Sequence, residues 1–243
     1  MSVSYADPAN LAFVVIPFLL LVTLTFATIA AWQRSGASLS AMWRTTILVG
    51  IAAVAWMEAT WMLAERGVFQ HWDRTPPPFA FLVAGIVIIS CLITFSDLGA
   101  RLARFIPLWI LVAVQAFRLP LELAMHAMYE RGVMPREMSY SGRNFDIVTG
   151  VTAIVVAALV ATGRGGKGLV AAWNVLGFAL LINVVAVAIL GTPRFRYFGE
   201  DRLNVWVTYT PFVWLPAVMV LAALAGHLII FRALGMQHAT SRV

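Results

Sequence analysis

Three charged side chains lie deep inside long apolar runs of this sequence: Glu58, Arg118 and Glu122. A charge at bilayer depth costs about 2.5–3.5 kcal/mol on insertion scales, so a membrane helix that carries one usually turns it toward a partner, a cavity or a pathway. Carboxylates and cations buried in this way bind polar ligands, carry protons or pair with one another. The three residues therefore predict a site inside the membrane.

Arg118 and Glu122 belong to a polar stripe. Gln115, Arg118, Glu122 and His126 follow one another at spacings of three, four and four residues. On an α-helix these spacings confine them to an arc of about 80°. Pro120 lies within the stripe and removes a backbone hydrogen bond, so we expect a kink or an unpaired carbonyl beside Arg118. The stripe predicts a single polar face on this helix.

Other polar groups are expected at the same level of the bilayer. Glu58 lies at a similar depth in another apolar run, and Asn183 and Tyr209 reach the same half. Several helices would then deliver polar groups to one chamber, open to the non-cytoplasmic side. The predicted ligand or proton site comprises Glu58, Gln115, Arg118, Glu122, His126, Asn183 and Tyr209.

Two other interpretations of these residues remain open. Arg118 and Glu122 are spaced as an i,i+4 ion pair, and with Glu58 as a third partner they would only fix the register of the helices. A metal site would use Glu58, Glu122 and His126 together with His71 from a loop, because carboxylate oxygens and imidazole nitrogens are suitable ligands. No particular metal is favoured, and no cofactor is identified.

Asn144, Asp146 and His227 have simpler interpretations. Asn144 and Asp146 precede an apolar run, where Asn is a good N-cap and a first-turn carboxylate complements the helix dipole. His227 lies in the last apolar run, and Tyr209, 18 residues earlier, would share its face if one helix held both. The default for His227 is a locally satisfied side chain, and a proton route along that helix is the alternative.

The composition places the whole chain in a lipid bilayer. Hydrophobic residues make up 61% of the 243 residues and charged residues only 12%, and about 20 helical residues cross a hydrocarbon core. The apolar runs are continuous rather than alternating, which excludes the strands of a membrane barrel. We predict an all-α, polytopic integral membrane protein, a single transmembrane domain over residues 1–243 with seven helices near 11–32, 45–64, 79–97, 105–129, 146–162, 169–190 and 207–234.

Several function classes are excluded by this organisation. The longest connection, 130–145, is too short for a soluble catalytic domain, and the basic residues are distributed over short loops, so we expect no nucleic acid partner. Lys167 is the only lysine and lies in a loop, which excludes a retinal Schiff base within the membrane. No His-Glu-x2-His and no Gly-x-Ser-x-Gly motif is present.

The topology is inferred from the loops. Alternate loops and the C-terminus are almost purely basic, with Arg34, Arg44, Arg101, Arg104, Arg164, Lys167, Arg232 and Arg242. The opposite set holds as many basic residues, Arg66, Arg74, Arg131, Arg136, Arg143, Arg194, Arg196 and Arg202, but offsets them with Asp7, Glu65, Asp73, Glu130, Glu137, Asp146, Glu200 and Asp201. Counting Lys and Arg alone gives a tie. The purely basic side is taken as cytoplasmic, which puts the N-terminus outside and the C-terminus in the cytoplasm.

Two segments carry a resemblance to a protein family. Phe117-Arg118-Leu119-Pro120-Leu121-Glu122 and Gly142-Arg143-Asn144-Phe145-Asp146 resemble segments of an uncharacterised family of bacterial multi-span membrane proteins. The resemblance implies a multi-pass protein of the bacterial inner membrane in which these residues matter, and it implies no activity.

The leading functional hypothesis is an outward-facing pocket that binds a small polar or anionic ligand or handles protons. Arg118 would anchor an anion, Glu122 and Glu58 would titrate, and His126 would lie nearest to water. The lipid bilayer is the expected partner. One alternative is a metal-dependent membrane enzyme that uses the Glu and His side chains as ligands. The other is a non-catalytic assembly or scaffold subunit, in an oligomer or a larger membrane complex.

Overall fold

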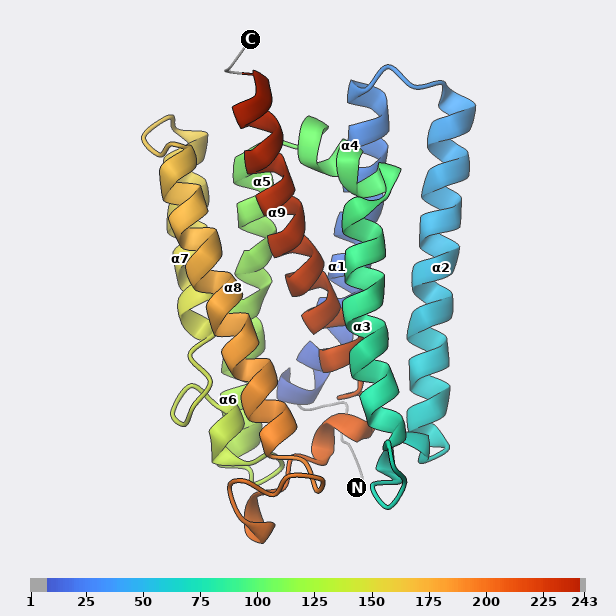
Figure 1. The fold of residues 1–243 in the computed structure, drawn as a ribbon, viewed down its shortest axis with the longest axis vertical. Helices are drawn as coiled ribbons and strands as arrows, with labels where there is room; N and C mark the ends of the chain where they lie inside the picture. Colours follow the sequence, from blue (N-terminus) through green and yellow to red (C-terminus); the bar gives the residue numbers. More distant parts are fainter. Residues whose placement is uncertain (1–7, 241–243) are drawn as a thin grey trace.

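The protein is an all-helical bundle of the kind that crosses membranes. The structure, a computed structural model, describes residues 8–240, and within that range no strand is formed. The long helices run side by side (Figure 1). Their bounds are α1 Pro8–Arg34, α2 Leu39–Glu65, α3 Pro78–Phe95, α4 Asp97–Phe105, α5 Leu108–Val114, α6 Arg118–Glu130, α7 Ile147–Ala161, α8 Lys167–Leu190 and α9 Leu221–Thr240.

Short non-α segments complete the chain. They are the 3-10 turns η1 Val68–Gln70, η2 Gln115–Phe117, η3 Arg136–Met138, η4 Glu200–Arg202 and η5 Trp206–Thr208, and the π-helix η6 Leu215–Val220. Segment η2 joins α5 to α6, and η6 leads directly into α9. Within the described residues, six helical segments are long and apolar enough to span a bilayer: α1, α2, α3, residues 108–130, α8 and residues 215–236. The chain is therefore a multi-pass membrane protein.

Some predicted boundaries differ from those observed. The fifth predicted span, 146–162, corresponds to α7, an apolar helix of only 15 residues. The seventh, 207–234, starts too early, because η5 and turns occupy residues 206–214 and the continuous helix begins at Leu215. Tyr209 consequently lies outside the helix of His227, so the shared face expected for the two residues does not exist.

A break after α3 creates a helix that the apolar pattern did not predict. The backbone of Ser96 is extended, and its hydroxyl oxygen accepts a 3.3 Å hydrogen bond from the backbone N–H of Gly99. Ser is a favoured N-cap, so α3 ends at Phe95 and α4 starts at Asp97. The helix α4 lies across one end of the bundle (Figure 1).

Helix α9 occupies the centre of the bundle. It lies between α3 and α8 and packs against both, and also against α4 and α5 (Figure 1). Two departures from regular α-helix face this region: η2 lies just before Pro120, and η6 contains Pro216. Because a proline cannot donate to the preceding turn, both irregular segments have an identifiable local cause. The irregularity expected beside Arg118 takes the form of the 3-10 turn η2.

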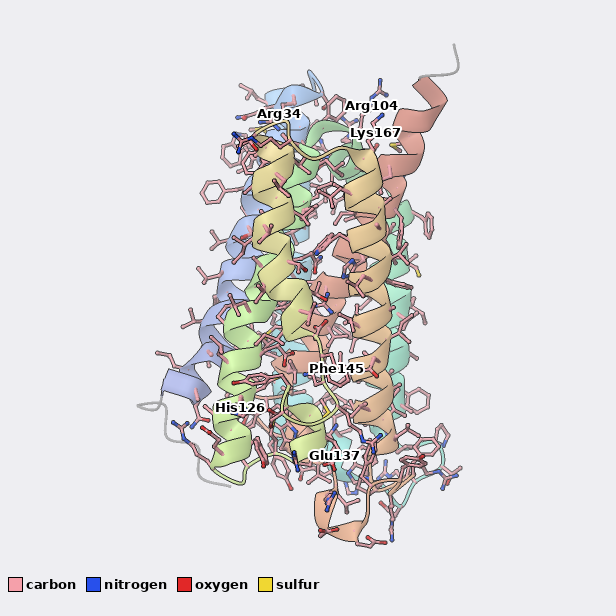
Figure 2. The ribbon with its side chains drawn as sticks, turned by 90° about the vertical axis from the view of Figure 1, so that its left-hand side faces the viewer. Arg34, Arg104, His126, Glu137, Phe145 and Lys167 are labelled. Atoms are coloured by element: carbon pink, nitrogen blue, oxygen red, sulfur yellow. The ribbon has the colours of Figure 1, made fainter. Side chains whose placement is uncertain are left out.

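The basic loops gather at one end of the bundle. Figure 2 shows Arg34, Arg104 and Lys167 together at that end, with His126 and Glu137 toward the other. Asp7 and Arg242, which also entered the topology argument, lie outside the described residues.

Candidate functional site

A buried ion pair joins α6 to the start of α7. Arg118 is 1% exposed and its Nε donates a 2.5 Å hydrogen bond to Oδ2 of Asp146, which is 4% exposed. The hydroxyl of Thr149, one turn into α7, donates to Oδ1 of the same carboxylate at 3.3 Å. Asp146 thus starts α7 and also neutralises the intramembrane arginine.

The same arginine contacts a histidine of α9. Nη1 of Arg118 lies 2.8 Å from Nε2 of His227, and Nδ1 of His227 lies 2.7 Å from Oδ1 of Asn174 on α8. Because a guanidinium can only donate, Nε2 accepts and Nδ1 carries the proton. The amide of Asn174 in turn donates to the backbone carbonyl of His227 at 3.1 Å. A continuous hydrogen-bonded chain therefore links α6, α7, α8 and α9.

Glu122 is held by an amide rather than by the arginine. Nδ2 of Asn144 lies 2.9 and 2.8 Å from the two carboxylate oxygens of Glu122 and also donates to the carbonyl of Met138 at 3.0 Å. Oδ1 of Asn144 accepts from the backbone N–H of Asp146 at 3.0 Å. The i,i+4 ion pair between Arg118 and Glu122, which was one interpretation of their spacing, is not formed as a direct contact: Arg118 pairs with Asp146, and Glu122 accepts from Asn144.

Two buried groups of the stripe have unused hydrogen-bonding capacity. Within the described residues, Nη2 of Arg118 and Oε1 of Gln115 have no hydrogen-bond partner. The other end of the Gln115 amide donates to the carbonyl of Ala223 at 3.4 Å. A buried donor without an acceptor costs about 1–3 kcal/mol, so an acceptor brought to Nη2 would be bound favourably.

Three residues of the polar cluster line an otherwise apolar cavity. Its volume is about 450 Å³, and Arg118, Glu122 and Asp146 line it together with apolar side chains of α3, α6, α8, η6 and α9. Binding sites for small molecules typically measure about 300–1,000 Å³ and combine apolar walls with a few polar groups. The arrangement matches that description.

The loops next to this cavity are linked by a second ion pair. Nη1 of Arg202 in η4 donates to Oε1 of Glu137 in η3 at 3.0 Å, and the next residue, Met138, lines the cavity. The hydrogen bond from Arg202 to Glu137 and the charge of this carboxylate raise the pKa of the Arg202 guanidinium above its usual value.

Glu58 does not belong to this site, contrary to the prediction. It is exposed on α2, whereas the neighbouring Met57 and Thr60 are buried. Its depth along the helix was inferred from the sequence, but its direction was not, because α2 is apolar on all sides and lacks a polar face that would reveal its orientation.

The remaining predicted residues are distributed around the cavity rather than within it. Nδ1 of His126 lies 2.7 Å from the hydroxyl of Ser139, and its ring stacks on Tyr140 at 4.2 Å between centroids. Asn183 donates to the carbonyl of Arg143 at 2.8 Å. Tyr209 is half-buried in the turn between η5 and η6.

The ligand set considered for a metal is not assembled. His71 is exposed in its loop, 3.9 Å from Asp73, and Glu58 is exposed on α2. His126 and Glu122 have the separate partners given above. Among the side chains that the structure describes, residues 9–236, no group of three or more His, Cys, Asp or Glu is placed to hold a metal ion.

Sequence reasoning favoured helix capping for Asn144 and Asp146 and a local role for His227, with a proton route as the alternative, and it overlooked Asn174. One signal was present: Asn144 and Asp146 fall in a segment that carried the family resemblance. Asn174 and His227 are polar residues in the middle of apolar runs, where an unpaired polar group is costly. Pairing each with a partner on another helix would have brought them into the site.

Fold and cluster together define a helical multi-pass membrane protein with a buried polar site. The chain belongs to the family described as a domain of unknown function, DUF8737, which matches residues 76–235. The matched region contains the whole Arg118, Glu122, Asn144, Asp146, Asn174 and His227 cluster. No curated protein and no solved structure matches the chain.

Proposed function

We propose that this protein is a seven-helix protein of the bacterial inner membrane that binds a small ligand in the cavity beside Arg118. The ligand places its polar group against Arg118 and Glu122 and its remainder along the apolar walls. The observation that carries the proposal is that Arg118 lines a cavity of about 450 Å³ while its Nη2, itself buried, has no hydrogen-bond partner in the described part of the chain.

The proposed membrane topology counts α7 as a crossing helix. At 1.5 Å per residue its 15 residues extend about 22 Å, less than the hydrocarbon core of about 30 Å. The N-terminus lies outside and the C-terminus in the cytoplasm. This orientation is supported by the loops at the end where Arg34, Arg104 and Lys167 lie (Figure 2), which are almost purely basic, whereas acidic residues offset the basic residues of the opposite loops.

Replacing Glu122 by Gln tests the proposal, with Glu58→Gln as the matched control. Both substitutions remove one carboxylate from a membrane helix, but Glu122 lines the cavity and Glu58 is exposed. Protein is purified in native lipid nanodiscs and its bound small molecules are extracted and quantified by mass spectrometry. We expect one compound, near one equivalent per protein in the wild type and in Glu58→Gln, to fall about tenfold in Glu122→Gln.

The scaffold interpretation makes the opposite prediction. If Glu122 served only the packing of the helices, Glu122→Gln would lower the unfolding midpoint while the set of bound molecules stayed the same. That result, or the same loss of the compound in Glu58→Gln, would contradict the proposal.

A further inference from the structure

We propose that the ligand is a membrane-soluble amphiphile with a long hydrocarbon chain and a hydroxyl head, and that it enters from the bilayer between α3 and α8. The inference rests on the proposed function and adds the chemical class of the ligand and its route.

The walls of the cavity determine what the body of the ligand is made of. Away from the polar groups, its lining is aliphatic, aromatic and thioether side chains, including Val83 and Ile86 of α3, Leu181 and Val185 of α8, and Met219 of η6. Such walls offer no partners to a sugar, nucleotide or amino acid, whose polar groups would lose their hydrogen bonds to water. A hydrocarbon chain makes no hydrogen bonds to water, so it loses none on entering the cavity.

The cavity opens toward the lipid rather than only toward water. Val87 on α3 and Ile182 on α8 both line it, yet they are 49% and 54% exposed. Both lie on membrane-spanning helices, so the environment of their exposed surfaces is hydrocarbon. Helix α9 packs between α3 and α8, and η6 precedes it along the chain. Met219 of η6 and Leu224 of α9 also line the cavity. An acyl chain can therefore enter sideways.

The polar residues that line the cavity, Arg118 and Glu122, determine which head group the ligand can have. Nη2 of Arg118 can only donate and has no acceptor in the described part of the chain, whereas the carboxylate of Glu122 accepts from one neutral amide, that of Asn144. A hydroxyl can accept a hydrogen bond from Nη2 of Arg118 and donate one to the carboxylate of Glu122. An ammonium head could not accept from Nη2. A carboxylate head would bring a second carboxylate to Arg118, which already pairs with Asp146, and like charges repel strongly in a low dielectric.

The probe is hexadecanol with a diazirine in its chain, presented to the protein in phosphatidylcholine nanodiscs and cross-linked by light. We expect saturable labelling of α3 and α8, about tenfold above that of the matching alkane without a hydroxyl. Equal labelling by the two probes would overturn the inference without requiring any variant.

The route is tested by narrowing the mouth. In Val87→Trp/Ile182→Trp, bulky side chains occupy the opening, and we expect labelling to fall at least fivefold. The matched control is Ile88→Trp/Val175→Trp, at exposed positions of the same two helices that do not line the cavity. Equal labelling of the two variants would overturn lateral entry.

The outcome also separates this inference from the proposed function. If a compound that depends on Glu122 co-purifies but hexadecanol does not saturate the protein, the binding site stands and the amphiphile is wrong. If no such compound is found and no probe saturates, both proposals fail.

Discussion

Replacing Asp146 by Leu is expected to lower the free energy of unfolding by about 3–5 kcal/mol, the usual cost of leaving one partner of a buried ion pair alone. Arg118 would remain 1% exposed with its charge facing a leucine. The free energy is measured by titrating dodecyl sulfate into dodecyl maltoside micelles and following helicity by circular dichroism.

The double variant Arg118→Met/Asp146→Leu identifies the origin of this loss. Replacing both charges by apolar groups of similar volume is often neutral, so we expect the double variant to be more stable than Asp146→Leu alone. If the double variant instead lost as much free energy of unfolding as Asp146→Leu, or more, the ion pair itself and not the unpaired charge would determine stability.

An exposed pair with the same nitrogen–oxygen distance serves as the control. Arg196 and Glu200 are also joined at 2.5 Å, but their side chains are 55% and 68% exposed. Because water screens such pairs, Glu200→Leu should produce a much smaller loss than Asp146→Leu. Burial, not distance, then accounts for the difference.

The helices could be predicted from the sequence because a continuous apolar run long enough to cross the bilayer forms an α-helix, which satisfies its backbone hydrogen bonds internally. The exceptions are local. The polar segment after α3 was expected to be a loop, but the Ser96 cap starts the helix α4 there. The late start of the last helix depends on η5 and the turn of residues 209–213. Those residues are mostly apolar, so a hydropathy pattern does not separate them from the helix that follows.

The candidate site was predictable along one helix but not across helices. Gln115, Arg118 and Glu122 are all buried, as their spacing indicated. Their partners come from α9, from the start of α7 and from the loop before it. Spacing within one helix carries no information about which residues of another helix face it. Glu58 illustrates the limit: it was placed in the site by depth alone and lies exposed on α2.

Asp146 shows how a local signal can conceal a tertiary role. Its position before an apolar run indicates a carboxylate that complements the helix dipole, and it does precede α7. The same position brings its carboxylate to Arg118. One residue therefore both starts α7 and pairs with Arg118, so the distance between α7 and α6 determines the geometry of the ion pair.

Replacing Gly150 by Ala is expected to separate these two helices. A methyl group at this position would lie 2.4 Å from the backbone nitrogen of Leu119 and 3.0 Å from the carbonyl carbon of Arg118, and backbone atoms cannot rotate away. Overpacking typically costs about 1–3 kcal/mol. We expect a loss in this range in the dodecyl sulfate titration, together with a lower content of the bound compound.

Gly168→Ala provides the comparison, since an added methyl group meets no atom within 4 Å there. In the first turn of α8, alanine should leave the protein unchanged or slightly more stable, because glycine is the poorer helix former. Gly150 lies four residues after Asp146, one turn along α7, so the contact of α7 with the backbone of Arg118 also sets the position of the carboxylate. If Gly150→Ala matched Gly168→Ala in stability and in bound compound, the geometry of the site would not depend on this close approach.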